Sequence, residues 1–133
     1  MGRRVLARAI RIWTRSTGYV QAELSEERSP KTAEAVWKAL PIKGRANRWG
    51  DEIYFSIPVK VGEEKGQEVV ERGDLGYWPP GNAFCIFFGR TPASQGDEIR
   101  AASPVNVFGR VTGNPEAFKA VKNGEEIRIE KAE

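Results

Sequence analysis

An arginine, a tryptophan and two acids stand side by side in the stretch NRWGDEIYFSIPV, just before an alternating run of apolar and polar residues. The two acids, Asp51 and Glu52, are of the type that serves acid–base or metal chemistry. Adjacent residues of a strand point to opposite faces, so both cannot face one substrate if the strand has already begun. We therefore interpret them as ion-pair partners of Arg48 or Arg45, next to either a working site or a plain strand entry.

Two aromatic residues with polar tips are candidates for the wall of a hydrated groove. Tyr54 lies within the alternating run, and Trp78 ends the short run LGYW before the turn PPGN. A phenol or indole ring offers a large apolar face together with one hydrogen-bonding group, and both residues stand beside polar neighbours. The same two rings would equally well cover one end of a barrel.

The residues that the chain lacks exclude several classes of site. There is no histidine, which removes His-based acid–base catalysis, Ser–His triads and His-ligated metals. The single cysteine, Cys85, allows no internal disulfide and no structural zinc site, and we expect a buried, inert thiol in a reducing compartment. We predict no metal and no cofactor.

The charge is unevenly distributed. Residues 1–48 hold 11 Lys and Arg against 4 Asp and Glu, whereas residues 49–133 hold 10 against 14, which gives +7 and −4. A basic half can bind nucleic acid, but these arginines are spread singly and not interleaved with aromatics. We interpret them as solvated strand edges and expect no nucleic-acid partner.

The order of predicted elements indicates one mainly β domain over residues 1–133. Alternation predicts strands at 1–13 and 19–24 as a hairpin. Further strands are predicted at 53–57, 69–70, 75–78, 83–89, 105–111 and 125–132, and the largely apolar run at 83–89 indicates a strand buried on both faces. A helix is predicted at 29–41, capped by Ser29, because Ala33, Val36, Trp37 and Leu40 recur at helical spacing. A second helix is predicted at 114–124, capped by Asn114. Residues 42–46 read as a polar connector and 90–104 as a long loop. A closed β-barrel of about eight strands, with the two short helices capping its ends, accommodates this order.

No apolar run is long enough for a transmembrane helix. The basic and partly apolar start MGRRVLARAIRIW has arginines within its apolar part and no small-residue cleavage site. We expect a mature N-terminus and a cytoplasmic protein.

Three blocks of the chain resemble the cyclophilins. They are SPKTAEAVWKAL at the first predicted helix, FCIFFGRTP at the core strand, and VFGRVTGNPEAFKAV with EIRIEKAE at the end. NRWGDEIYFSIPV and GDLGYWPPGNAFCIFFGRTP are similar to the small cyclophilin-like family of prokaryotes, an atypical branch of that fold. The resemblance implies a compact cyclophilin-like β-barrel but no settled activity.

The resemblance also implies where a groove would lie. Arg48 follows the first helix and precedes a strand, as does the arginine that cyclophilins use as an electrophilic donor to the twisted Xaa-Pro amide; Trp49 adjoins it. Phe88 stands where the pocket phenylalanine would stand, although a shift of one residue would put Phe87 there instead. Tyr54 and Trp78 complete the candidate set.

Three groove elements of the cyclophilins are replaced in this chain. The glycine-rich, glutamine-bearing segment after the arginine becomes GDEIYFSIPV, and the Trp-and-His loop becomes ASQGDEIRAASP, with neither residue. We therefore expect a domain that binds a peptide or small ligand in a surface groove, with little or no isomerase activity. A divergent peptidyl-prolyl isomerase with Arg48 as catalytic donor is the alternative, so whether the protein is an enzyme stays open.

Overall fold

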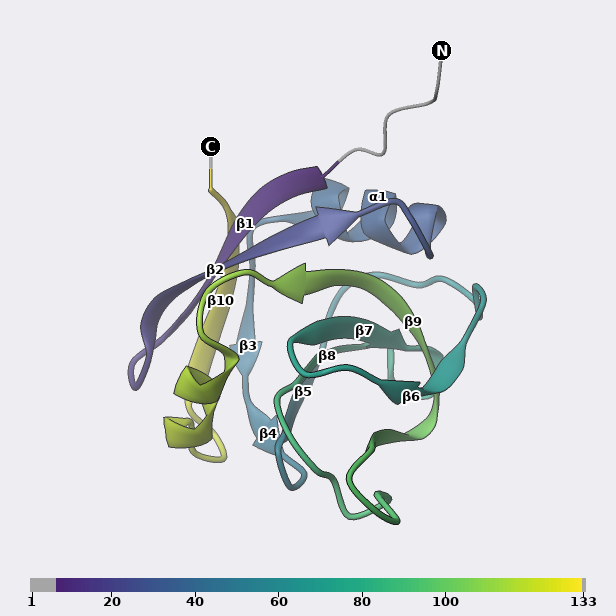
Figure 1. The fold of residues 1–133 in the computed structure, drawn as a ribbon. Helices are drawn as coiled ribbons and strands as arrows, with labels where there is room; N and C mark the ends of the chain where they lie inside the picture. Colours follow the sequence, from purple (N-terminus) through teal and green to yellow (C-terminus); the bar gives the residue numbers. More distant parts are fainter. Residues whose placement is uncertain (1–6, 133) are drawn as a thin grey trace.

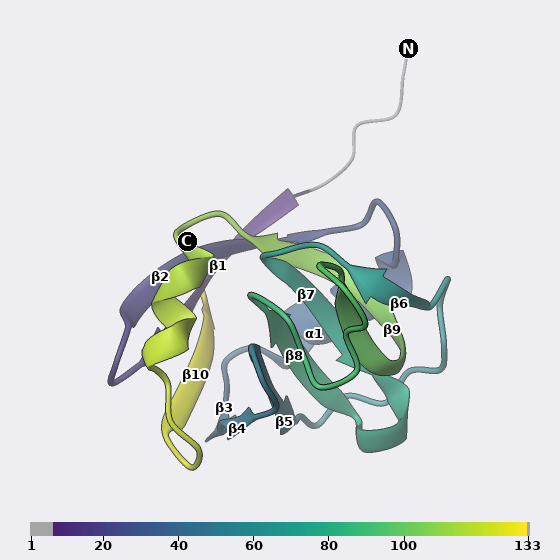
Figure 2. The same cartoon turned by 60° about the horizontal axis from the view of Figure 1, so that its bottom comes forward.

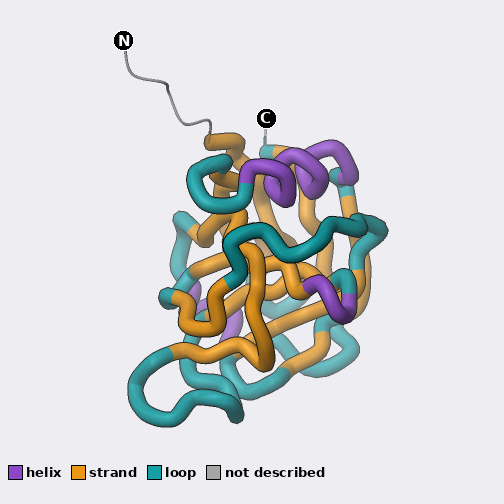
Figure 3. Tube along the Cα trace, turned by 90° about the vertical axis from the view of Figure 1, so that its right-hand side faces the viewer, coloured by secondary structure: helices purple, strands orange, loops and turns teal. Residues whose placement is uncertain are grey.

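The computed structural model describes residues 7–132; strands are its main regular structure, and loops run over the surface (Figures 1 and 3). The strands are β1 (Ala7–Thr14), β2 (Gly18–Ser25), β3 (Ile42–Arg45), β4 (Asn47–Arg48), β5 (Glu52–Ser56), β6 (Gln67–Val70), β7 (Asp74–Trp78), β8 (Ala83–Phe87), β9 (Ile99–Val111) and β10 (Glu126–Lys131). The helical segments are α1 (Pro30–Ala39) and the 3-10 turns η1 (Pro79–Gly81) and η2 (Pro115–Ala120). The part of the expected first strand before Ala7 and the expected N-terminus lie outside the described residues.

The strands follow one another in the hydrogen-bonded order β3-β10-β1-β2-β9-β7-β8-β5-β4, and β6 pairs with β9 beside this path. The two edge strands, β3 and β4, are separated in the chain only by Ala46, so the sheet curls round on itself (Figure 2). Within residues 7–132 the strand ladder does not run from β3 back to β4. Packing brings the ends together: Gly44 lies against the Phe55 ring, where a Cβ atom would be 2.8 Å from a ring carbon.

The expected closed barrel of eight strands is therefore wrong in strand number and in closure, while the mainly β class with helical segments is confirmed. The described chain has ten strands, because residues 42–46, expected as a connector, contribute β3 and lead into β4. β3 forms because it pairs with β10, so that Ile42 lies opposite Ile129. β9 also begins earlier than expected: Ile99 pairs with Val70 of β6, within the segment predicted as a loop.

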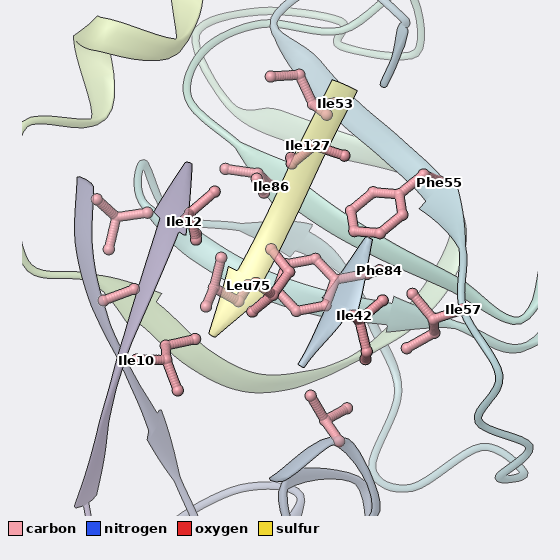
Figure 4. Packing of buried hydrophobic residues seen from close by; sticks show 14 of the residues in the cluster. Ile10, Ile12, Ile42, Ile53, Phe55, Ile57, Leu75, Phe84, Ile86 and Ile127 are labelled. Carbon is pink, nitrogen blue, oxygen red and sulfur yellow. The ribbon is translucent and has the colours of Figure 1, made fainter. Parts of the chain in front are cut away.

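The inner face of the curled sheet holds the main hydrophobic core (Figure 4). Large apolar side chains from strands far apart in the sequence point toward one another there; they include Ile10, Ile12, Ile53, Phe55, Leu75, Phe84, Ile86 and Ile127. Phe84 stacks on Phe55 at 5.5 Å between ring centroids and meets Phe108 edge-on at 5.3 Å. Burial of this apolar surface is the main stabilising contribution to the fold.

A second, smaller core lies on the outer face of β7 and β8. It contains Val70, Ala83, Cys85, Phe87, Ile99, Ala101, Val105 and Val107, with Tyr54 and Trp78 partly buried against it. The segment around Ile99–Val105 of β9 and strand β6 cover this face. All five residues of β8 are consequently buried, which confirms the prediction of a strand buried on both faces.

The segments α1 and η2 each add apolar side chains to the main core. α1 buries Ala33 and Val36, as its periodicity predicted, and Ser29 takes the N-cap position. The cap hydrogen bonds come from elsewhere: the Glu64 carboxylate accepts from the backbone N–H groups of Lys31 and Thr32 at 3.0 Å each.

The second segment, η2, lies beside β10 in both ribbon views (Figures 1 and 2) and buries Phe118. Its first turn is capped as predicted, because the Asn114 side chain accepts from the backbone N–H of Glu116 at 3.0 Å. It is a 3-10 helix of six residues and ends earlier than the helix expected to Gly124. Among the described residues, no helix is long and apolar enough to cross a membrane.

Candidate functional site

Arg48 at the end of β4 is fixed by hydrogen bonds to its own protein. Its guanidinium makes four such bonds: Nε donates to the Gly50 carbonyl at 3.0 Å, and the Nη atoms donate to the Lys119 carbonyl at 3.2 Å, the Val121 carbonyl at 2.8 Å and Asp51 Oδ1 at 3.2 Å. An arginine has five N–H groups, so most of its donors are engaged. The side chain is only 23% exposed.

These contacts connect β4 to the end of η2 and to the segment that follows it. The backbone N–H of Arg48 donates to Asn123 Oδ1 at 2.6 Å, and the guanidinium lies 5.1 Å from the centroid of the Phe88 ring. Phe88 itself is fully buried and packs against Phe118 at 6.1 Å. Arg48, Asp51 and Phe88 thus form a structural cluster at the start of β5, which we call the Arg48 corner.

The choice between Phe87 and Phe88 has a clear outcome in the structure, because neither ring reaches the surface. Phe88 belongs to the main core and Phe87 to the smaller core on the outer face, and both are 0% exposed. Adjacent strand residues point to opposite faces, which divides the pair between the two cores. Both pack as structural side chains.

The other three candidate residues come together in one place. Trp49, Tyr54 and Trp78 line a pocket of about 230 Å³ on the outer face of the sheet, and we call it the aromatic pocket. The remaining lining residues are Glu52, Cys85, Ala101, Ala102 and Val105. Tyr54 comes from β5, Trp78 from the end of β7, and Trp49 from the turn between β4 and β5.

Strand register explains why these side chains meet. Tyr54 of β5 pairs with Cys85 of β8, and Trp78 of β7 pairs with Ala83 of β8, so the three strands form a continuous floor. Alternation sends Ile53 into the main core and Tyr54 outward. The β9 residues Ala101, Ala102 and Val105 supply the wall; no candidate was predicted there, because residues 90–104 were read as a loop.

Three contacts fix the positions of Trp78 and Trp49. Trp78 Nε1 donates to Ser103 Oγ at 2.7 Å, and the Trp78 ring lies so close to Gly81 that a Cβ there would be 2.9 Å from a ring carbon. The backbone N–H of Trp49 donates to the Glu52 carbonyl at 2.9 Å across a turn in which Gly50 has φ +62°. A positive φ of this size favours glycine.

Glu52 is the one strongly buried acid of the aromatic pocket. It is 6% exposed, and its Oε1 atom has no hydrogen-bond partner within residues 7–132. Burial raises the pKa of Glu52 to about 7, and the neighbouring Cys85 thiol, a weak donor, offsets this only in part. The Cys85 Sγ also donates to the Ala83 carbonyl at 3.9 Å, so Glu52 and this carbonyl share one weak donor.

The two adjacent acids face opposite ways, as the alternation predicted. Asp51 pairs with Arg48, one of the two expected partners. The expected ion pair of Glu52 is wrong, because this side chain enters the aromatic pocket, whose lining has no lysine or arginine. The signal for Glu52 was present in the sequence: it stands two residues before Tyr54 on the same strand and therefore on the same face. Among the described residues, no group of three or more acids and cysteines could hold a metal ion.

Known proteins resemble the chain in sequence and in structure. The family model described as Cyclophilin-like matches residues 8–130. The solution structure of the hypothetical protein AF2241 from Archaeoglobus fulgidus is similar to the chain, with 47% sequence identity and a TM-score of 0.81. That match covers 99% of this chain and 100% of the archaeal chain. No curated protein matches the sequence.

Proposed function

The chain belongs to the cyclophilin-like family, and from this premise we propose that it is a binding domain with little or no prolyl isomerase activity. Its aromatic pocket would hold a small molecule or a single side chain of a peptide. One observation carries the proposal: Trp49, Tyr54 and Trp78 line one pocket, while the donors of Arg48 are bonded elsewhere.

The size of the pocket limits its occupant. Sites for drug-sized ligands usually have volumes of roughly 300–1,000 Å³. A pocket of about 230 Å³ suits a smaller molecule, or one side chain of a peptide lying across the surface. The aromatic rings would supply most of the buried apolar contact.

The geometry gives the isomerase alternative little support. A donor for the twisted amide must be free to bond the substrate at the moment of reaction. In this protein, bonds to the Lys119 and Val121 carbonyls hold the Arg48 guanidinium, and its aromatic neighbour Phe88 is fully buried.

Two arginines of the basic first half form ion pairs, which supports the expectation of no nucleic-acid partner. Arg8 forms ion pairs with Glu26 at 3.8 Å and Glu34 at 3.1 Å, and Arg11 pairs with Glu130 at 3.1 Å. Neutralised arginines of this kind contribute little net positive field.

The test combines exchange spectroscopy with ligand screening. NMR measurement of cis/trans exchange in a panel of Xaa-Pro peptides should show no acceleration by the wild-type protein. A fragment library should shift resonances of Trp49, Tyr54 and Trp78. Trp78→Ala should abolish those shifts, whereas the matched control Trp13→Ala, on β1, should leave them unchanged. Catalysis lost in a folded Arg48→Ala variant would overturn the proposal in favour of the isomerase.

A further inference from the structure

The aromatic pocket contains a buried acid, Glu52, that has only the weak donor Cys85 beside it and lies among aromatic rings. Glu52 is nine-tenths buried, its Oε1 has no partner among the described residues, and the side chains around it are Trp49, Tyr54 and Trp78. No lysine or arginine is among the residues that line the pocket. An isolated buried carboxylate is unfavourable unless a cation or hydrogen-bond donor accompanies it.

The faces of aromatic rings select the same kind of partner. The ring faces of tryptophan and tyrosine carry negative potential and attract cations, most strongly when water is excluded. Trp78 is held by its bond to Ser103, so its ring needs no reorganisation on binding. A neutral ligand would leave the ionised form of Glu52 without compensation, and an anion would be repelled by that form.

We infer that the aromatic pocket binds a small organic ammonium ion, with Glu52 as its counter-ion and the rings of Trp49, Tyr54 and Trp78 as its walls. This inference rests on the proposed binding function and specifies the class of ligand. The volume of about 230 Å³ accommodates a quaternary ammonium group with a short substituent.

The inference includes a defined dependence on pH. The titratable groups of the pocket are Glu52, Tyr54 and Cys85; burial raises the pKa of the Cys85 thiol, so it stays neutral. On the β9 wall, Arg100 is paired with Glu68 at 3.4 Å and Glu98 at 3.1 Å. A cation binds the ionised form of Glu52, so affinity should rise with pH up to the pKa of about 7 and then level off.

Three probes of equal size separate the outcomes. Choline carries a fixed positive charge at every pH, dimethylbutanol is its uncharged carbon isostere, and trimethylacetate is an anion of similar shape. Binding of each is followed by NMR titration at pH values of about 6 and about 8. We expect choline to bind at least about tenfold more tightly than the isostere at the higher pH, and several-fold more weakly at the lower pH.

A variant isolates the charge of Glu52. Glu52→Gln keeps the shape and removes the charge, so it should weaken choline binding about tenfold or more while leaving the isostere unaffected. Asp74→Asn is the matched control, because Asp74 is another buried acid, 8% exposed, that lies outside the aromatic pocket. It should not change the affinity for choline. The pH dependence of choline affinity in the wild-type protein tests the role of the Glu52 charge independently of any variant.

The possible results distinguish the inference from the proposed function. Tighter binding of the isostere or of trimethylacetate, or choline binding that strengthens as pH falls, would overturn the ammonium inference while leaving the binding function intact. If none of the three probes and no library fragment shifts the pocket resonances, both the ammonium inference and the proposed binding function are wrong.

Discussion

The Arg48 corner and the aromatic pocket lie on opposite sides of one strand entry, and they treat adjacent carboxyl groups in opposite ways. Asp51 in the corner is about one-third exposed and paired with Arg48 at 3.2 Å. Glu52 in the pocket is 6% exposed, with an Oε1 atom that has no partner among the described residues. Alternation along the strand separates them.

This difference is the basis for proposing that the corner stabilises the fold and that the pocket binds a ligand. The corner satisfies its polar groups internally: Arg48 bonds three backbone carbonyls and one carboxylate over an aromatic ring. The pocket keeps a buried acid without a full set of partners, which costs folding free energy. Such an arrangement is retained where a ligand completes it. Substitutions on the two sides should therefore differ in sign and in what they affect.

The largest effect is expected for Phe88→Ala in the corner. The ring is 0% exposed and packs on Phe118, so truncation leaves a cavity and should cost about 3–5 kcal/mol of unfolding free energy. Urea unfolding measures the loss, and Phe88→Leu should recover most of it. Probe binding by the folded fraction should be unchanged. Selective loss of binding with full stability would place Phe88 in the functional site instead.

The second-largest effect is expected at Glu52 in the pocket, where a substitution should raise the unfolding free energy. The pKa of Glu52 is raised from 4.5 to about 7, so the folded protein holds this proton more tightly than the unfolded chain. The associated stability is fully present below the ordinary value of 4.5 and is lost as pH rises to the folded value of about 7. Relative to the protonated form, ionisation then costs about 3 kcal/mol, because one pKa unit corresponds to about 1.4 kcal/mol.

Glu52→Gln removes that cost. Unfolding free energies measured near pH 8 should be higher for the variant by up to about 3 kcal/mol, and the difference should shrink toward about pH 4. Saturating choline should narrow it, because the ammonium ion stabilises the ionised wild-type protein. A variant that is destabilised at every pH would mean that Glu52 contributes a structural hydrogen bond.

Much of the fold followed from local patterns in the sequence. Periodicity and caps predicted α1, alternation predicted the hairpin of β1 and β2, and a largely apolar run predicted the buried strand β8. β3 and β4 were missed because they have four and two residues and are recognisable only from their partners β10 and β5. The early start of β9 was missed for the same reason, since β6 pairs with that polar segment.

The sequence predicted the surroundings of some candidate residues better than those of others, depending on how far apart in the chain the contacting residues lie. Tyr54 and Trp78 meet because β5 and β7 both pair with β8, and Trp49 stands in the turn that leads into β5. Alternation placed each side chain relative to its own strand but not the pairing of the strands. The surroundings of Arg48 come from Lys119, Val121 and Asn123, more than 70 positions away, and no local pattern shows that they occupy its donors. Burial of Phe88 likewise depends on packing from η2, which only the fold brings near.

The smallest effect is expected for Asp51→Asn, the matched change next to Glu52. The Asp51–Arg48 pair is partly exposed, and Arg48 keeps its bonds to three carbonyls, so the loss should be below about 1 kcal/mol and should decrease with added salt. Urea unfolding near pH 8, with both single variants in one series, gives the comparison. Asp51→Asn should be slightly destabilising and leave choline binding unchanged, while Glu52→Gln is stabilising and weakens it. If the two substitutions changed stability in the same direction, the strand would not separate a structural face from a binding face.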